Sequence, residues 1–269
     1  MTIRIFVGTA ANNEDLESQA VLEYTLRKYT SEELEITWMQ QTRDPASMYY
    51  GWNTTGWATP FSGFRWSIPA ACAFEGRAIY LDSDMIVQAD IAELYNKTLN
   101  PGYAVMAKGI SERFCCTLFD NAVVEQHMFP LARLKKEAGM HRLQRQRLAK
   151  PGIVQSFPRD ENWNCLDGEN YADLKDPRIK IHHYTAIDCQ VQLKYALPRL
   201  AKAGLPHWFK GTYRPHPRPD LQALFDQALE EAIEADYHPE NYEVEPFGNY
   251  ASGGSEGGAW VKGPAKMGV

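Results

Sequence analysis

Two aspartates that follow a short apolar run carry the clearest chemical signal in the sequence. The run from Ala78 to Leu81 follows Gly76 and is almost wholly apolar, which is typical of a buried strand. Asp82 and Asp84 come next, and in an extended backbone their i, i+2 spacing points both side chains the same way. Neighbouring carboxylates repel each other unless a cation or protons neutralise them. Because ligands bind at the carboxyl ends of strands in open α/β sheets, the pair predicts a divalent-metal site that holds a phosphorylated ligand.

Other interpretations of the aspartate pair are weaker. An EF-hand loop starting at Asp82 would place Ile86 and Val87 at positions 5 and 6, where an oxygen ligand and a glycine are required. Haloacid-dehalogenase phosphatases usually carry their DxD motif on the first strand, whereas here a β-α-β unit already precedes it. A solvated turn with two Asp residues is the structural alternative. A cation held by two carboxylates and completed by substrate phosphates suits Mg²⁺ and Mn²⁺.

The usual nucleotide-binding motifs are absent. No GxGxxG follows the first predicted strand, and no GxxxxGK[ST] occurs in the chain. Gly51 and Gly56 have the glycine spacing of a P-loop, but Trp57 stands where the lysine should be. A nucleotide would therefore have to be bound by other means.

Hydrophobic periodicity predicts an α/β chain that opens as β-loop-α-β. The predicted strands are 3–7, 34–39, 78–81, 103–108, 115–119 and 178–183. The predicted helices are 14–29, 64–74, 91–95, 191–203 and 221–235. We expect a main domain over 1–190, a helical C-terminal extension over 191–245 and a loose glycine-rich tail over 246–269.

The composition restricts the class of protein. The 269 residues are 44% apolar and 23% charged, as in ordinary globular proteins. A formal charge of −6 argues against a nucleic-acid binder, which usually carries a basic face. The first residues lack the pattern of a signal peptide, and no apolar run reaches about 18 residues, so neither a secretory leader nor a membrane span is expected. The five cysteines are odd in number and form no CxxC pair, so we expect a reduced, cytoplasmic protein.

Two further segments could contact ligands. Residues 44–62 are rich in aromatic residues and glycine, and predict a loop that either covers a ligand or caps the core. Residues 131–150 form a basic helical stretch. This stretch is interpreted as a solvated face or as a contact with an anionic acceptor or a membrane surface. Peripheral contact with the inner face of a membrane is therefore included among the expectations.

Seven blocks, in order, resemble the GT-A glycosyltransferases, specifically family 8 and its bacterial relatives. They lie at 3–8, 59–66, 76–84, 89–94, 118–122, 161–168 and 181–185. The resemblance implies a GT-A (Rossmann-like) α/β fold, with a mixed, mostly parallel sheet flanked by helices and a C-terminal helical extension. Residues 1–190 would form the catalytic domain that binds a nucleotide sugar.

The resemblance also implies a set of metal ligands. Asp82 and Asp84 look like the DxD ligands, and His183 looks like the late histidine that completes the shell. His182 is the adjacent candidate. A neutral imidazole is a reasonable ligand beside carboxylates for Mn²⁺, and Mg²⁺ is the alternative cation.

Further roles are implied for residues around the nucleotide sugar. Arg65 is similar to the arginine that contacts the donor's sugar and phosphates, a task that suits a guanidinium fork. Asp120 and Asn164 would line the reacting face as catalytic groups. The remaining positions assigned to donor binding are Gly8, Thr9, Ala10 and Ser83.

The implied activity is that of a metal-dependent retaining hexosyltransferase. It would move a hexose from a nucleotide-diphosphate sugar, with UDP as the expected nucleotide, to a glycan or another hydroxyl acceptor. One departure is that residues 186–189 replace the Lys-Pro-Trp that grips the diphosphate in family 8, so Lys194 or Arg199 would have to substitute. The alternatives are a non-catalytic protein that binds a nucleotide sugar, a partner subunit, or a nucleotidyltransferase on a similar fold.

Overall fold

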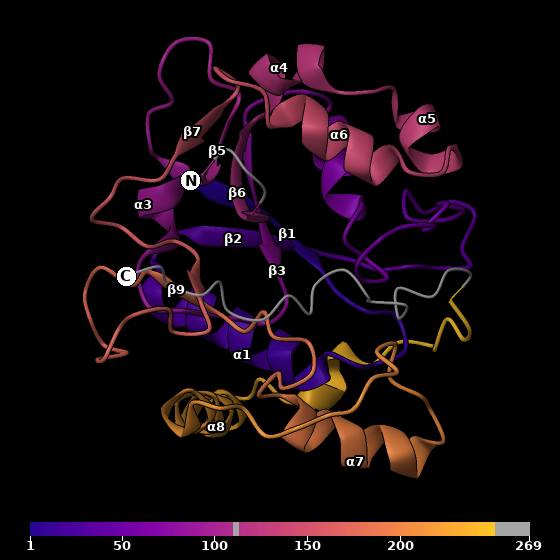
Figure 1. Ribbon diagram of the computed structural model, residues 1–269, viewed down its shortest axis with the longest axis vertical. Helices are drawn as coiled ribbons and strands as arrows, with labels where there is room; N and C mark the ends of the chain where they lie inside the picture. Colours follow the sequence, from indigo (N-terminus) through magenta and orange to yellow (C-terminus); the bar gives the residue numbers. More distant parts are fainter. Residues whose placement is uncertain (110–112, 251–269) are drawn as a thin grey trace, which may run out of the picture.

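The computed structural model describes residues 1–109 and 113–250 and is built on a six-stranded sheet (Figure 1). The strand order is β2-β1-β3-β6-β5-β7. Five strands point the same way, and only β6 runs against them, between β3 and β5. The mixed, mostly parallel sheet predicted from the sequence is therefore confirmed. The strands are β1 (Thr2–Gly8), β2 (Glu33–Met39), β3 (Arg77–Asp82), β5 (Val105–Lys108), β6 (Arg113–Asp120) and β7 (Val154–Ser156).

The sheet is buried on both faces, which explains the near-continuous apolar runs of β1 and β3. On one face Ile5 and Leu81 pack with Leu22 of helix α1 (Leu16–Tyr29). On the other face Phe6 and Tyr80 belong to a second core cluster. That cluster is filled by the short helical segments η1 (Phe64–Ser67) and α2 (Ile68–Ala71), and by Trp52, Trp57 and Phe61 of the aromatic loop. These three rings therefore cap the core.

A small second sheet stands at the carboxyl end of β3. Its strands are β4 (Met85–Val87), β9 (Ile181–His183) and β8 (Cys165–Leu166), in the order β4-β9-β8. β4 and β9 are antiparallel, and Met85 pairs with His183. The residue that follows Asp84 is therefore paired with His183 in the β4–β9 strand pair.

The remaining helices cover the ends and one side of this core. Helix α8 (Pro219–Glu234) packs on α1, and Lys28 of α1 pairs with Glu231 at 2.6 Å (Figure 1). The others are α3 (Ile91–Tyr95), α4 (Asn121–Val124), η2 (Glu125–His127), α7 (Leu193–Ala203) and η3 (Pro239–Tyr242). Within the described part of the chain, every helix is too short or too polar to span a bilayer.

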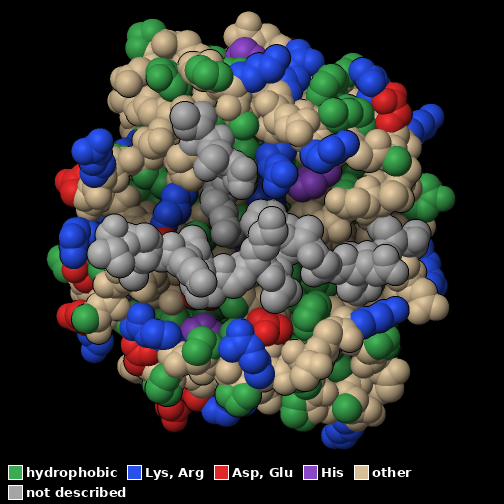
Figure 2. Space-filling model, in the orientation of Figure 1, with side chains coloured by type: hydrophobic (Ala, Val, Ile, Leu, Met, Phe, Trp, Pro, Cys, Tyr) green, Lys and Arg blue, Asp and Glu red, His purple; other side chains and the backbone are tan. Residues whose placement is uncertain are grey.

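The basic stretch predicted as helical over 131–150 consists of two helices, with a break that was not predicted from the sequence. Helix α5 (Leu131–Lys136) and helix α6 (Met140–Leu148) are separated at Gly139, whose φ of 76° lies in the left-handed region. Figure 2 shows several Lys and Arg side chains in the upper part of the molecule, where Figure 1 places α5 and α6. The basic surface formed by residues 131–150 is thus built from two short elements.

Several predicted boundaries differ from the structure. The strand predicted over 178–183 is limited to β9, and β4, β7 and β8 were not predicted. Each of these strands has at most three residues, too few for a periodic pattern to stand out. The tail predicted as loose over 246–269 falls mostly outside the described residues. Its first part is ordered, because Phe247 N donates to Ala11 O at 3.0 Å and Tyr250 Oη accepts from Ala11 N at 2.9 Å.

Candidate functional site

The three predicted metal ligands lie together at the carboxyl end of β3. The Nε2 atom of His183 is 3.2 Å from Oδ1 of Asp84 and 3.6 Å from Oδ2 of Asp82. All three side chains are largely buried. The exposed fraction is 3% for His183, 13% for Asp84 and 11% for Asp82. The antiparallel pairing of β4 with β9 produces this meeting. Two acidic groups and one imidazole therefore face one another in a site with little access to water.

His183, and not its neighbour, is the histidine that faces the carboxylates. Adjacent residues of a strand point to opposite faces, so β9 can present only one of its two histidines to the aspartates. The Nε2 atom of His182 lies 3.0 Å from the Leu174 carbonyl oxygen, and burial lowers the pKa of that imidazole. Of the two histidines, His183 is therefore the one that faces the aspartates, and the metal site proposed below uses it.

Asn164 orients the His183 ring. Its Oδ1 atom lies 2.8 Å from Nδ1 of His183, and an amide oxygen can only accept, so Nδ1 is the donor. In the neutral ring this leaves the Nε2 lone pair facing Asp82 and Asp84. Burial disfavours a charge on His183, but the two aspartates outweigh it and raise the pKa of the imidazole. Asn164 thus lies in the site, and its contact is with the histidine.

Arg65 is hydrogen-bonded to the carboxylate of Asp82. Its Nη2 donates to Asp82 Oδ1 at 3.0 Å, and the Tyr80 hydroxyl donates to the same oxygen. The other two guanidinium nitrogens also donate hydrogen bonds: Nε to the Ser62 carbonyl at 2.8 Å and Nη1 to the Phe114 carbonyl at 2.5 Å. Arg65 is 6% exposed, so the guanidinium that was predicted to touch the donor is used to fix the Asp82 carboxylate.

Only one of the two carboxylate oxygens of Asp84 accepts a hydrogen bond within the described residues. Its Oδ2 accepts a hydrogen bond from Gln190 Nε2, and Gln190 also donates to the Tyr184 carbonyl at 2.9 Å. Its Oδ1 atom is buried without a hydrogen-bond donor among the described residues. Burial accordingly raises the pKa of Asp84. An acceptor without a donor, facing an imidazole nitrogen and a second carboxylate, fits a cation.

The sequence did not indicate that Cys115 belongs to this cluster. One candidate ligand atom from each of Asp82, Cys115 and His183 lies within 4.8 Å of the other two. Cys115 comes from β6, and the register of β6 against β3 pairs Leu81 with Cys116, one step from this position. The sequence predicted a strand over 115–119 but gave no indication of its partner strand, so the position of Cys115 beside Asp82 was not deducible.

The residues predicted to bind the nucleotide lie beside the same end of β3. Gly8 pairs with Asp82 in the sheet, and the Gly8 carbonyl accepts from Ser83 N at 3.2 Å. A buried carboxylate, Asp15, joins this group by accepting from Ala10 N at 2.8 Å, Thr9 Oγ1 at 3.1 Å and Ser83 Oγ at 3.3 Å. Burial raises the pKa of Asp15 to about 6. Asp15 was not singled out from the sequence, because it falls at the start of the helix predicted over 14–29 and belongs to no motif.

Asp120 does not lie in the site, so its predicted catalytic position was wrong. It pairs with Arg77 at the opposite end of β3 from Asp82, about 16 Å away along the strand. Its Oδ1 atom accepts from Val123 N at 3.1 Å, which caps α4. The physical reason is the direction of β6, whose carboxyl end lies beside the amino end of its neighbour β3.

The two residues suggested as substitutes for the diphosphate grip are engaged elsewhere. Lys194 pairs with Asp226 at 2.6 Å on the surface of the helical extension. Arg199 pairs with Glu17 of α1 at 2.7 Å and also donates to the Asn13 carbonyl at 2.6 Å. The first contact joins α7 to α8 and the second joins α7 to α1, so both side chains have structural roles here.

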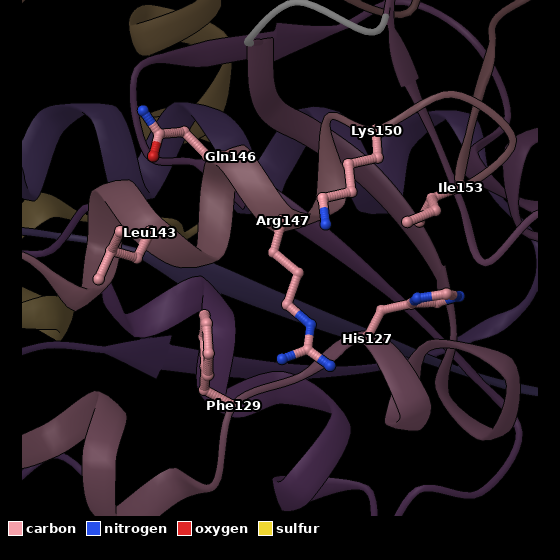
Figure 3. A pocket seen from close by; sticks show the side chains of 7 residues that line it. All are labelled: His127, Phe129, Leu143, Gln146, Arg147, Lys150 and Ile153. Carbon is pink, nitrogen blue, oxygen red and sulfur yellow. The ribbon is translucent and has the colours of Figure 1, made fainter.

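A pocket of about 400 Å³ lies outside the carboxylate cluster, beside α6 (Figure 3). Figure 3 shows the Arg147 side chain pointing from α6 toward Phe129 and His127. The guanidinium carbon of Arg147 is 4.7 Å from the centre of the Phe129 ring, and Arg147 also donates to the Gln126 carbonyl at 3.0 Å. The pocket is lined by His127, Phe129, Leu143, Gln146, Arg147, Lys150 and Ile153.

The architecture and the carboxylate-ended strand place the chain among α/β proteins with the GT-A type of fold. No protein-family model and no curated protein matches the sequence. Among solved structures, the glycosyltransferase GlyE of Streptococcus pneumoniae TIGR4 is similar with a TM-score of 0.52 and 16% identity, over 88% of this chain and 65% of GlyE. The bifunctional glycosyltransferase WbbM is similar with a TM-score of 0.50 and 12% identity, over 69% of this chain and 46% of WbbM. The chain therefore spans less than two thirds of either structure, and the likeness concerns the fold.

Proposed function

We propose that the protein is a metal-dependent glycosyltransferase related to family 8. It would transfer a hexose, with retention, from a nucleotide-diphosphate sugar to a glycan or another hydroxyl acceptor, with UDP as the nucleotide. The observation that carries the proposal is the convergence of Asp82, Asp84 and His183 at a strand end of a GT-A type fold. The similarity to GlyE and WbbM, both glycosyltransferases, supports the same class of reaction.

The cluster of Asp82, Asp84 and His183 would hold Mn²⁺ or Mg²⁺. A cation at this position would stabilise the negative charge of the departing nucleoside diphosphate. The orphaned Oδ1 atom of Asp84 supports this assignment. The Nε2 atom of His183, 3.2 Å away, offers a second lone pair when the ring is neutral.

The chain's own residues keep these ligands in position. Arg65 and Tyr80 fix one oxygen of Asp82 and leave the other turned toward His183. Asn164 sets the tautomer of His183, and Gln190 restrains Asp84. Because the groups are buried and already hydrogen-bonded, little reorganisation would accompany ligand binding.

Gly8, Thr9, Ala10 and Ser83 would contact the nucleotide. This assignment is supported by the pairing of Gly8 with Asp82 in the sheet, because it places residues 8–10 beside the proposed metal ligands. Gly8 also approaches the Tyr80 hydroxyl so closely that an added Cβ would lie 2.6 Å from it. Only glycine fits there without displacing the tyrosine that holds Asp82.

We propose in addition that the basic surface of residues 131–150 contacts an anionic membrane surface near the acceptor. This segment carries seven Lys or Arg residues and one Glu in a chain of net charge −6. Leu143, on the same helix as Arg147, is 41% exposed and would reach the interface. Such basic clusters with an exposed apolar side chain favour anionic lipid surfaces.

The test is a donor screen with a product assay. UDP-, GDP- and CDP-sugars would be incubated with the protein with and without Mn²⁺, and the released nucleotide identified. Release of a nucleoside diphosphate that depends on Mn²⁺ supports transfer. Release of pyrophosphate would instead identify a nucleotidyltransferase, and donor binding without turnover of any donor would identify a non-catalytic binding protein.

A further inference from the structure

Cys115 brings a sulfur atom to a cluster whose other donors are oxygen and nitrogen. β6 lies antiparallel to β3, and the pair of Leu81 with Cys116 places Cys115 beside the strand end that carries Asp82. The thiol lies against the Asp82 carboxylate and the Arg65 guanidinium. Its sulfur is within 4.8 Å of ligand atoms of both Asp82 and His183. A thiol in this position is not needed for a site that binds only Mg²⁺ or Mn²⁺.

We propose that Cys115 is a further ligand at this site, and that the site therefore binds thiophilic divalent ions such as Zn²⁺ and Cd²⁺ more tightly than Mg²⁺ or Mn²⁺. Thiolate ligands select soft ions, whereas carboxylate sites without sulfur suit Mg²⁺ and Mn²⁺. Cys115, His183 and Asp82 would supply donors of the types S, N and O, which are the donor types of zinc sites, and Asp84 lies beside His183 as a further oxygen donor. Thiophilic ions would then compete with Mn²⁺ for Asp82 and His183.

The separations are compatible with this coordination. Zn–S bonds of about 2.3 Å and Zn–N or Zn–O bonds of about 2.1 Å place tetrahedral ligand atoms roughly 3.5 Å apart. The three atoms here are within 4.8 Å of one another, so shifts of about 1 Å close them on an ion. As the metal–sulfur bond forms, the S–H bond of Cys115 breaks and the proton leaves to solvent. No oxidation or reduction is involved.

The test is a Cd²⁺ titration followed by the ultraviolet charge-transfer absorption of a cadmium–thiolate bond. The inference rests on the proposed cation site, but the readout does not require glycosyl transfer, so an inactive protein still answers the question. The full chain is used, with Cys115→Ser as the test variant. Cys116→Ser is the matched control, because Cys116 is the adjacent thiol of the same strand, is fully buried and points to the opposite face.

We expect the band to saturate at one Cd²⁺ per chain in the wild type and in Cys116→Ser, and to disappear in Cys115→Ser. Loss of a residue that hydrogen-bonds to a metal ligand typically weakens metal binding about 10- to 100-fold. Loss of the thiolate ligand itself should therefore weaken Cd²⁺ binding by about 100-fold or more. Mn²⁺ affinity should change by less than about threefold, since its oxygen and nitrogen ligands remain. Excess Mn²⁺ should reduce the band.

Three results would overturn the proposal: no band in the wild type, an equal band in Cys115→Ser, or a band that excess Mn²⁺ leaves unchanged. A cadmium NMR spectrum of the wild type gives an independent answer without any variant. A resonance in the range of oxygen and nitrogen ligands alone would exclude Cys115 as a ligand even if Cys115→Ser fails to fold.

Discussion

The Nε2 atom of His183 lies 3.2 Å from the Oδ1 atom of Asp84, although the two residues are far apart in the sequence. The contact exists because β4 begins directly after Asp84 and takes β9 as its antiparallel partner. Within the described residues, this strand pair unites the late histidine with the aspartates of β3. The site and the small sheet are therefore one structural feature.

Replacement of Asp84 by Asn should strongly weaken both cation binding and turnover. Asn keeps the size and an acceptor oxygen, but it removes the negative charge that a divalent cation requires. We expect Mn²⁺ affinity and Mn²⁺-dependent donor turnover to fall by roughly 100-fold or more, measured by calorimetry and product release. Asp90→Asn is the matched control, since Asp90 caps α3 through Ala92 N and Asn can serve as the same cap. Equal Mn²⁺ binding by both variants would remove Asp84 from the ligand set.

Replacement of Asn164 by Leu should weaken Mn²⁺ binding without removing a metal ligand. Leucine is similar in size but cannot accept the proton of His183 Nδ1, so the ring loses its fixed tautomer. Outer partners of metal-bound histidines contribute about 10- to 100-fold to affinity, and a loss in that range is expected. Asn164→Asp restores an acceptor oxygen and should recover most of the affinity. If Leu and Asp at this position bind Mn²⁺ equally well, Asn164 does not act through His183.

Replacement of Asp120 by Ala should affect stability and leave turnover intact. The change removes the cap of α4 at Val123 N, which corresponds to about 1 kcal/mol of unfolding free energy. Chemical denaturation and the rate per folded molecule measure the two effects separately. Asp120→Asn retains a capping oxygen and should be nearly neutral for both. If the Asp120→Asn protein is well folded but loses most of its turnover, Asp120 has a catalytic role and the prediction is wrong.

Stability should decrease as the pH rises through the pKa of Glu14. Burial, with Asp15 nearby, raises the pKa of Glu14 from 4.5 to about 8, so the folded protein keeps a proton that the unfolded chain releases. Its contribution is fully present below pH 4.5 and is lost progressively up to about pH 8, by at most roughly 5 kcal/mol. Glu14→Gln should flatten this dependence in urea unfolding measured from pH 5 to 9, because Gln retains an acceptor for Asn12 N and the Tyr250 hydroxyl. An unchanged slope in Glu14→Gln would mean that another group titrates.

The basic surface of residues 131–150 should bind anionic vesicles in a salt-dependent way. Neutralising Arg142 and Arg145 by Gln should cost about 1 kcal/mol for each, or roughly 30-fold in the partition coefficient together. Co-sedimentation with phosphatidylserine vesicles at low and high salt measures this. Arg27→Gln with Arg178→Gln is the control, since both of these arginines pair with acidic neighbours elsewhere. Equal binding to neutral vesicles would show that charge does not direct the contact.

The elements that were predicted best are those with a strong local pattern. β1, β2 and β3 were identified from apolar or alternating runs, and α1, α7 and α8 from helical spacing. The break at Gly139 was missed because a single glycine inside a basic stretch is compatible with a continuous helix. β4, β7 and β8 were missed because two or three residues form a strand only when a partner strand is present.

The sequence alone determined that two carboxylates follow a buried strand, because strand burial and side-chain alternation depend on neighbouring residues. The resemblance to the GT-A glycosyltransferases, and not the local pattern, suggested His183 and Arg65 as their companions. The tertiary structure decided which histidine faces the aspartates, that Arg65 holds Asp82, and that Cys115 joins the cluster while Asp120 does not. These outcomes depend on strand direction and register, which are set by contacts between segments distant in the chain. A local pattern contains no information about them.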